Sequence, residues 1–205
     1  MNTMMGRLAV ACVLLGGIHS ICSAQAPGDN IKIINNSLKL DKANVPNEVS
    51  RPTSDVAKEL SDDWYVAEVK FSTQDPITEE VQVKFYIDGL DSLKNDLFVV
   101  LTGEETYVNV PKGEHYAVMY LDPMALLRYG GKKDKARGFK KSNLHIEILS
   151  GGQVQDKLSK NQLSDKDDPN WFTAGQATPG VLIGVKDSPW WPFDARRYNR
   201  IKPKN

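Results

Sequence analysis

The sequence predicts an all-β protein, on three observations. Apolar and polar residues alternate over most of the chain, which is the period of strands with one buried and one wet face. Gly, Pro and Asp interrupt these runs at short intervals, as turns require. Helical periodicity is confined to one or two short stretches, so the strand–helix rhythm of a parallel sheet is missing. About eight or nine short strands of this kind favour an antiparallel β-sandwich of immunoglobulin type.

The strands follow from the alternation. The clearest is 81–88, where apolar residues at the odd positions alternate with largely polar residues at the even ones. Residues 64–71 repeat this pattern, and the pairs 75–76 (Asp-Pro) and 88–89 (Asp-Gly) supply turn residues at the ends of the two runs. The other expected strands are 31–40, 96–102, 105–110, 115–121, 144–149, 153–158 and 181–185.

Two local motifs are predicted from their capping and turn residues. Gly151-Gly152 stands between two strand patterns and is typical of a tight hairpin turn. Asp122, a proline and an apolar run that stops at Gly130 predict one short helix, with Asp122 as its N-cap. A second single helical turn is expected over 54–60.

Residues 1–24 have the three parts of a secretory signal peptide. Arg7 is the only charge, 8–18 is an apolar run, and small residues end at Ala24. We expect cleavage there, which leaves Gln25 first and places the protein in the periplasm, on the outer surface or outside the cell. The apolar run of 11 residues, at about 1.5 Å per residue, covers only about half of a ~30 Å hydrocarbon layer, so a membrane anchor is the weaker interpretation.

Composition excludes several classes of function. Basic and acidic residues number 26 each, so a net charge of zero provides no general attraction for nucleic acid. Both cysteines fall within 1–24, so the mature chain is expected to lack disulfides, thiolate nucleophiles and cysteine-bound metals. We expect a sandwich domain over 25–168 and an aromatic-rich C-terminal extension over 169–205 that contributes a strand.

Few residues suit catalysis or metal binding. The expected mature chain has two histidines: His115 opens a strand next to Glu114, and His145 is expected on the polar side of a strand beside Glu147. Each could act as a base or a ligand, but isolated histidines are more often surface or strand-end residues. The acidic stretch 165–168 lacks the spacing of an EF-hand. Carboxylate pairs suited to glycoside hydrolysis stay open, because only the fold sets their separation. We therefore predict no catalytic residue, no metal and no cofactor.

Two parts of the sequence are candidates for an interaction surface. A basic run follows the expected helix and could contact an acidic partner or a charged glycan, although such runs are usually solvated loops. The last 37 residues hold six of the 17 aromatic residues. Exposed, these would form a sugar-stacking platform or a protein interface; buried, which we favour, they would attach the tail to the sandwich. The candidate residues are Trp190, Trp191, Phe193, Lys132, Lys133, Lys135 and Arg137.

The end of the chain carries a further signature. It consists of 180–189 (Gly-Val-Leu-Ile-Gly-Val-Lys-Asp-Ser-Pro), 192–194 (Pro-Phe-Asp) and 198–201 (Tyr-Asn-Arg-Ile). Together with the signal peptide and the Gly-Gly hairpin, it resembles a family of small secreted verrucomicrobial proteins, immunoglobulin-like and encoded beside type IV pilus-like components in a mucin-degrading gut commensal. The resemblance implies a sandwich related to the globular domains of archaeal pilus subunits and a role at the cell surface. It implies no catalytic residue.

These observations predict a non-enzymatic exported interaction protein with protein partners in a type IV pilus-like or other cell-surface assembly. The chain lacks the long N-terminal assembly helix of pilus subunits, which favours an accessory role. The alternative is a glycan-binding β-sandwich module for mucin-type sugars, suggested by the tail aromatics and the basic run. A hydrolase that uses acidic side chains is a third possibility.

Overall fold

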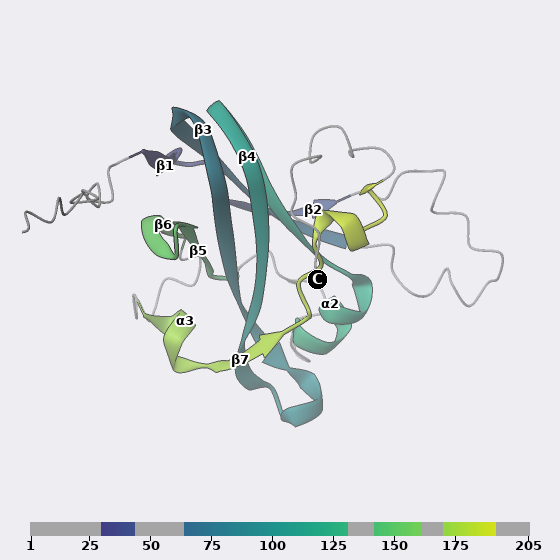
Figure 1. Cartoon of the computed structure of the whole chain (residues 1–205). Helices are drawn as coiled ribbons and strands as arrows, with labels where there is room; N and C mark the ends of the chain where they lie inside the picture. Colours follow the sequence, from purple (N-terminus) through teal and green to yellow (C-terminus); the bar gives the residue numbers. More distant parts are fainter. Residues whose placement is uncertain (1–29, 44–63, 131–141, 161–169, 192–205) are drawn as a thin grey trace, which may run out of the picture.

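The structure, a computed structural model, describes residues 30–43, 64–130, 142–160 and 170–191 (Figure 1). The described part is mostly strand, with two short α-helices, which confirms the predicted fold class. Its strands are β1 (Ile31–Ile33), β2 (Lys39–Ala43), β3 (Trp64–Asp91), β4 (Leu97–Leu121), β5 (Leu144–Ser150), β6 (Gln153–Lys160) and β7 (Gln176–Pro179). Its helices are α2 (Pro123–Tyr129) and α3 (Trp171–Ala174), with 3-10 turns η1 (Ser92–Lys94) and η3 (Val185–Asp187).

Two long strands, β3 and β4, form the centre of the sheet. They pair antiparallel along most of their length, from Tyr65 with Leu121 to Asp91 with Leu97. β1 and β2 pair with the first half of β3, while β5 pairs with its second half and β6 with β5. β7 joins the other side of β4 in parallel, so the sheet is mixed rather than purely antiparallel as predicted.

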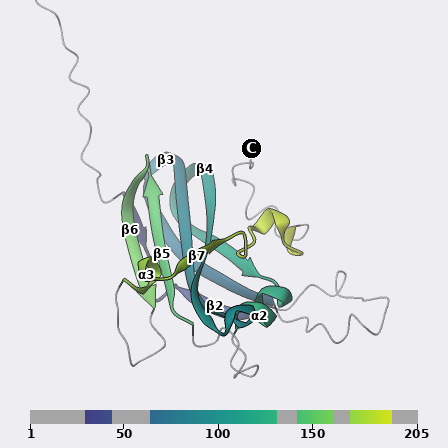
Figure 2. The same cartoon turned by 90° about the horizontal axis from the view of Figure 1, so that it is seen from below.

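The β3–β4 hairpin bends back on itself, so that one sheet supplies both layers of the sandwich (Figure 2). Its register shifts between Thr73 and Ile77, at Pro76, whose nitrogen has no hydrogen to donate to a ladder. The rings of Phe71 and Tyr107 pack 6.3 Å apart although they belong to different halves of the hairpin. The turn residues at 75–76 therefore mark a bend inside one strand, where the sequence predicts the end of a strand.

The inner face of this curled sheet holds the core. The odd positions of β3 that the alternation identifies are buried, and β1, β2, β4 and β5 add their own inward residues. The predicted strands 64–71 and 81–88 are both parts of β3, and 96–102, 105–110 and 115–121 are all parts of β4. The separate short strands were a wrong prediction, because backbone pairing with the neighbouring strand continues past each break in the sequence pattern.

The predicted strand at 181–185 is also wrong. The strand of the C-terminal extension is β7, and residues 181–185 make only an isolated bridge between Ile183 and Tyr120. Leu182 and Val185 are buried in the core instead. These two apolar side chains therefore pack against the core, and the segment that carries them does not pair as a strand of the sheet.

The short helix and the Gly-Gly hairpin, both predicted from local residues, are confirmed. The Asp122 carboxylate accepts a hydrogen bond from the Ala125 amide at 2.6 Å, and the Gly130 amide donates to Leu126 O at 3.0 Å. Gly151 and Gly152 have φ of 57° and 76°, as a type I′ hairpin turn between β5 and β6 requires. The helical turn expected at 54–60 and the signal peptide at 1–24 lie outside the described residues.

Gly103 of β4 lies where the two halves of the sheet pack closely together. A Cβ at this position would lie 2.6 Å from Leu182 Cβ and 2.8 Å from Met119 Sδ. Met119 belongs to the same strand, and a straight strand of that length would separate it from Gly103 by about 50 Å. The contact therefore requires β4 to bend between Gly103 and Met119. Only glycine at position 103 leaves room for this close approach.

We expect Gly103→Ala to lower the free energy of unfolding by about 1–3 kcal/mol, because the added methyl displaces Leu182 or Met119 in a packed core. Thr102→Val, on the adjacent residue of the same strand, should change stability by no more than about 0.5 kcal/mol. Urea unfolding followed by tryptophan fluorescence measures both. Equal stability of the two variants would contradict the close approach.

Candidate functional site

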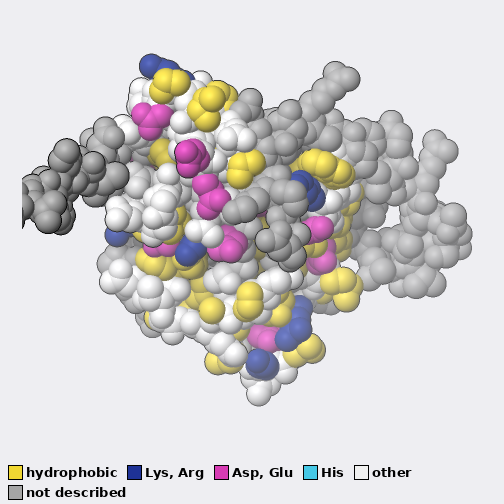
Figure 3. Space-filling view, viewed as in Figure 1, with side chains coloured by type: hydrophobic (Ala, Val, Ile, Leu, Met, Phe, Trp, Pro, Cys, Tyr) yellow, Lys and Arg dark blue, Asp and Glu magenta, His cyan; other side chains and the backbone are white. Residues whose placement is uncertain are grey.

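Large apolar side chains are exposed together where β3 turns into β4 and where helix α2 packs beside that turn. Figure 3 shows hydrophobic side chains among charged ones at this lower end of the molecule. Leu93 is 76% exposed and Met124 60%. Exposed apolar area of this kind marks contact surfaces on soluble proteins. We call the three that also line the pocket described next the apolar end patch: Leu93, Met124 and Leu127.

A pocket of about 540 Å³ opens in this patch between η1 and α2. The chain that follows β7 closes one side of it, so three segments far apart in the sequence meet there. The lining includes Leu93 from η1, Met124, Leu127 and Arg128 from α2, and Gly180 and Val181 from the C-terminal extension.

Helix α2 supplies apolar residues on two faces. Ala125 and Tyr129 are buried against the sheet, whereas Met124 and Leu127 point outward. A surface helix normally carries polar residues on its outer face. The sequence contains this signal, because a seven-residue helix with so few polar residues cannot bury all its apolar side chains on one side. Our sequence reasoning missed it.

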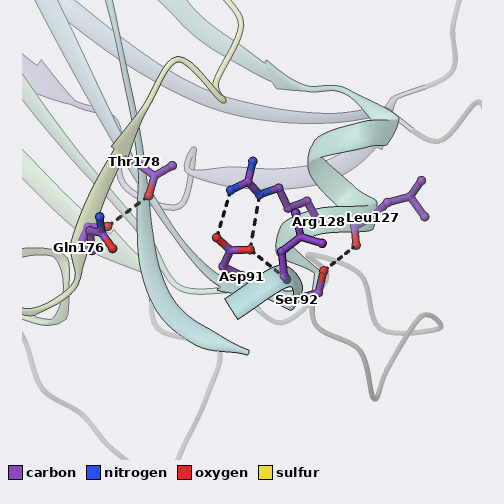
Figure 4. A network of polar contacts seen from close by, with 7 residues as sticks. Asp91, Ser92, Leu127, Arg128, Gln176 and Thr178 are labelled. Atoms are coloured by element: carbon purple, nitrogen blue, oxygen red, sulfur yellow. Dashed lines mark hydrogen bonds and ion pairs between the residues drawn. The ribbon is translucent and has the colours of Figure 1, made fainter. Parts of the chain in front are cut away.

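An ion pair fixes the helix against the end of β3 (Figure 4). Arg128 Nη2 lies 3.2 Å from Asp91 Oδ2, and Nε lies 3.4 Å from Oδ1. Asp91 Oδ1 also accepts a hydrogen bond from the Leu93 amide at 3.1 Å, so one carboxylate holds both walls of the pocket. The hydrogen bonds from Arg128 keep the pKa of Asp91, which is 2% exposed, below its ordinary value. The pair therefore joins α2 to the turn between β3 and β4.

The candidate residues from the tail lie elsewhere. Trp190 stacks on Tyr120 with ring centroids 4.5 Å apart, and its edge meets Trp64 at 5.4 Å. Trp191 lies under Lys186, whose Nζ is 5.9 Å from the ring centroid. Both tryptophans are partly buried against the core, so this part of the tail is attached to the sandwich. Phe193, Lys132, Lys133, Lys135 and Arg137 lie outside the described residues.

His145 is buried, and its expected place on a wet polar face was wrong. Its side is the outer face of β5, but α3 covers that face and leaves the residue 2% exposed. Phe172 of α3 stacks on the imidazole with centroids 3.7 Å apart and planes 5° apart. Phe172 lies 27 residues further along the chain than His145. The alternation of residues around His145 therefore cannot show that α3 covers this position.

Polar groups of Ser159, Glu147 and Tyr86 surround His145. Its Nδ1 lies 2.6 Å from Ser159 Oγ, and its Nε2 lies 3.7 Å from Glu147 Oε1. The Tyr86 hydroxyl donates to Glu147 Oε2 at 3.0 Å. Burial lowers the pKa of His145 and, with the Glu147 hydrogen bond, raises the pKa of Tyr86 to about 12. Burial thus favours the neutral form of the histidine, which packs beneath Phe172 of α3.

Neither His115 nor His145 lines the pocket described above. Serine, histidine and glutamate are also the residue types of a hydrolytic triad, but the pocket described above is not lined by His145 or Ser159. His115 Nε2 donates to Pro111 O at 2.8 Å, which ties it to the bend of β4. Within the described ranges, no group of three or more His, Cys, Asp or Glu could hold a metal ion.

A protein-family model matches residues 24–205. The chain belongs to that family. The chain shares its fold with a crystal structure of a protein from Akkermansia muciniphila, a verrucomicrobe, which is 20% identical with a TM-score of 0.61 over 86% of this chain and 94% of that chain. This verrucomicrobial match agrees with the resemblance carried by the closing signature.

Two further solved structures are more distant. A β-D-glucoside glucohydrolase from Trichoderma reesei is 11% identical, with a TM-score of 0.31 over 64% of this chain and 18% of that chain. A β-galactosidase described as putative in Bacteroides fragilis is 13% identical, with a TM-score of 0.27 over 65% and 15%. Neither likeness bears on the function of this family member. A search of curated protein sequences finds no match.

We expect the wild-type protein to lose stability relative to His145→Gln as pH falls from 7.5 to 5. The folded-state pKa of His145 lies below its ordinary 6.5, so the fold binds fewer protons than the unfolded chain. Its contribution is therefore complete above about pH 6.5 and is lost as pH falls through the folded-state pKa. Urea unfolding at several pH values measures the difference. Parallel pH profiles of the two proteins would contradict the prediction.

We expect Arg128→Ala to speed hydrogen exchange at the α2 amides, Leu126 and Gly130 included, because the helix loses its ion pair with a nearly buried carboxylate. Amides of the β5–β6 hairpin should be unaffected. Lys94→Ala removes a neighbouring cation without breaking the pair and serves as the control. Unchanged exchange in α2 would show that the other contacts alone hold the pocket.

Proposed function

We propose that the protein is an exported, non-enzymatic interaction protein of a cell-surface assembly, pilus-like or related, and that the apolar end patch is its main contact with a partner protein. Membership of the matched family and the shared fold with the Akkermansia protein support the general role. The patch is the observation that carries the contact, because it joins exposed apolar side chains to a pocket whose walls are linked by the Asp91–Arg128 pair.

The energetics of the patch favour a protein partner. Burying a large aliphatic side chain is worth about 1.5–3 kcal/mol, so a partner that covers Leu93, Met124 and Leu127 gains several kcal/mol from these residues alone. The Asp91–Arg128 pair and the caps of α2 already fix the walls, so little ordering entropy opposes binding.

No helix of the described part is long and apolar enough to cross a membrane.

Five of the candidate residues lie outside the described part, so the sequence alone supports their place in this proposal. Lys132, Lys133, Lys135 and Arg137 follow the end of α2 at Gly130 within a few residues, and we propose that they extend the contact. Phe193, with Trp190 and Trp191, is proposed as a secondary contact. The glycan-binding alternative gains no support from these tryptophans, because Tyr120 covers one face of Trp190.

Site-directed crosslinking in the native bacterium tests the proposal. Residues 25–205 contain no cysteine, so Leu93→Cys introduces a single attachment point at the patch. We expect this variant to capture an identified component of a surface or pilus-like assembly, and Leu127→Glu in the same chain to abolish the capture. Val154→Cys, on the exposed side of β6, is the matched control and should not capture it. Equal capture from both positions, or capture of the protein alone, would contradict the proposal.

A further inference from the structure

We infer that Met124 is an oxidation-sensitive position of the apolar end patch, where a peroxide converts the thioether to the sulfoxide and weakens the contact with a partner. This inference rests on the proposed function and adds a regulatory modification to the same surface. Three observations carry it: the exposure of Met124, its place in the wall of the pocket, and the independence of the fold from its side chain.

Exposure distinguishes one sulfur atom from the other. Residues 25–205 contain two methionines and no cysteine. Met124 is 60% exposed, whereas Met119 is 2% exposed and belongs to the core. Oxidation of sulfur by a peroxide follows the exposure of the side chain. A peroxide that meets the folded protein therefore reaches Met124 and not Met119.

The modification is an oxygen transfer. With hydrogen peroxide, an S–O bond forms between Met124 Sδ and one peroxide oxygen while the O–O bond breaks. The sulfur loses two electrons, which reduce the peroxide, and the second oxygen leaves as water. Methionine sulfoxide reductases return the sulfoxide to the thioether. The change is therefore reversible, as a regulatory modification requires.

The fold does not depend on the Met124 side chain. Ala125 and Tyr129 hold α2 against the sheet, and the Asp122 carboxylate caps its first turn. The ion pair of Arg128 fixes its other end. Met124 itself lies outside the core cluster and points outward. A sulfoxide at this position therefore leaves the fold intact and acts on the contact surface.

The sulfoxide makes one wall of the pocket polar. Two polar side chains of the lining are already engaged, because Arg128 is bound to Asp91 and the Ser92 hydroxyl donates to Leu127 O (Figure 4). The new oxygen at Met124 therefore takes its hydrogen bonds from water. A partner that covers the pocket has to remove this water, and burial of a polar group without a replacement hydrogen bond is unfavourable.

Peptide mass spectrometry of the full protein after hydrogen peroxide treatment tests the reactivity. We expect Met124 of the folded protein to gain one oxygen at least about tenfold faster than Met119. The two residues should react at similar rates in guanidinium chloride, where the core is open. The urea midpoint of the oxidised protein should equal that of the untreated protein. Equal rates in the folded protein, or a lowered midpoint, would overturn the inference.

Binding of the neutral apolar dye Nile red measures the pocket without a partner. We expect the wild-type protein to bind the dye roughly threefold more weakly after peroxide treatment, and to recover after incubation with a methionine sulfoxide reductase. Leu127→Glu should weaken dye binding before any oxidation, because it introduces a charge into the same lining.

Two variants are the matched controls. Met124→Leu keeps an apolar side chain without sulfur, so peroxide should leave its dye affinity unchanged. Met124→Leu combined with Val154→Met moves the exposed methionine to β6 and should also keep its affinity. Unchanged affinity of the oxidised wild-type protein, or an equal loss in Met124→Leu, contradicts the inference. Failure of the proposed function gives a different result: Leu93→Cys then captures no surface component, while the dye still reports the oxidation of Met124.

Discussion

The architecture depends on the bend of the β3–β4 hairpin. One face of the two long strands is mostly apolar, and a flat sheet would leave that face in water at a large free-energy cost. Folding the hairpin over buries the face against itself. The bend needs an interruption of the ladder, supplied at Pro76, and a point where the two halves can approach, supplied by Gly103. The C-terminal extension then covers the edge, with Leu182 at that point.

The same bend creates the candidate site at the other end of the hairpin. There the two strands run on to η1, beyond the core that the folded halves enclose. Helix α2 returns to this end directly after β4, and Asp91 joins the two through Arg128 and the Leu93 amide. A nearly buried carboxylate that loses its cation is costly, so the pair stabilises the contact between α2 and the end of β3. The ion pair beside the pocket and the close packing at Gly103 thus both follow from the folding of one hairpin.

Much of the fold could be predicted where the signal is local. Asp122, Gly130 and the Gly-Gly turn act through their own or adjacent backbone groups, so their roles are visible in the sequence. The inward face of β3 follows equally from its period of two. The continuity of β3 and β4 could not be predicted, because an Asp-Pro pair looks the same before a turn and at a bulge. The pairing of the neighbouring strands decides between them.

The sequence by itself determined that this protein is a β-sheet protein with an apolar face, one capped helix and one tight hairpin, since these depend on residue type and spacing alone. Only the tertiary structure decided that His145 lies beneath Phe172 and that Leu93 faces Met124 and Leu127. Both arrangements join segments roughly thirty residues apart. No periodicity encodes such a meeting, because the path of the bent sheet sets which side chains it brings together.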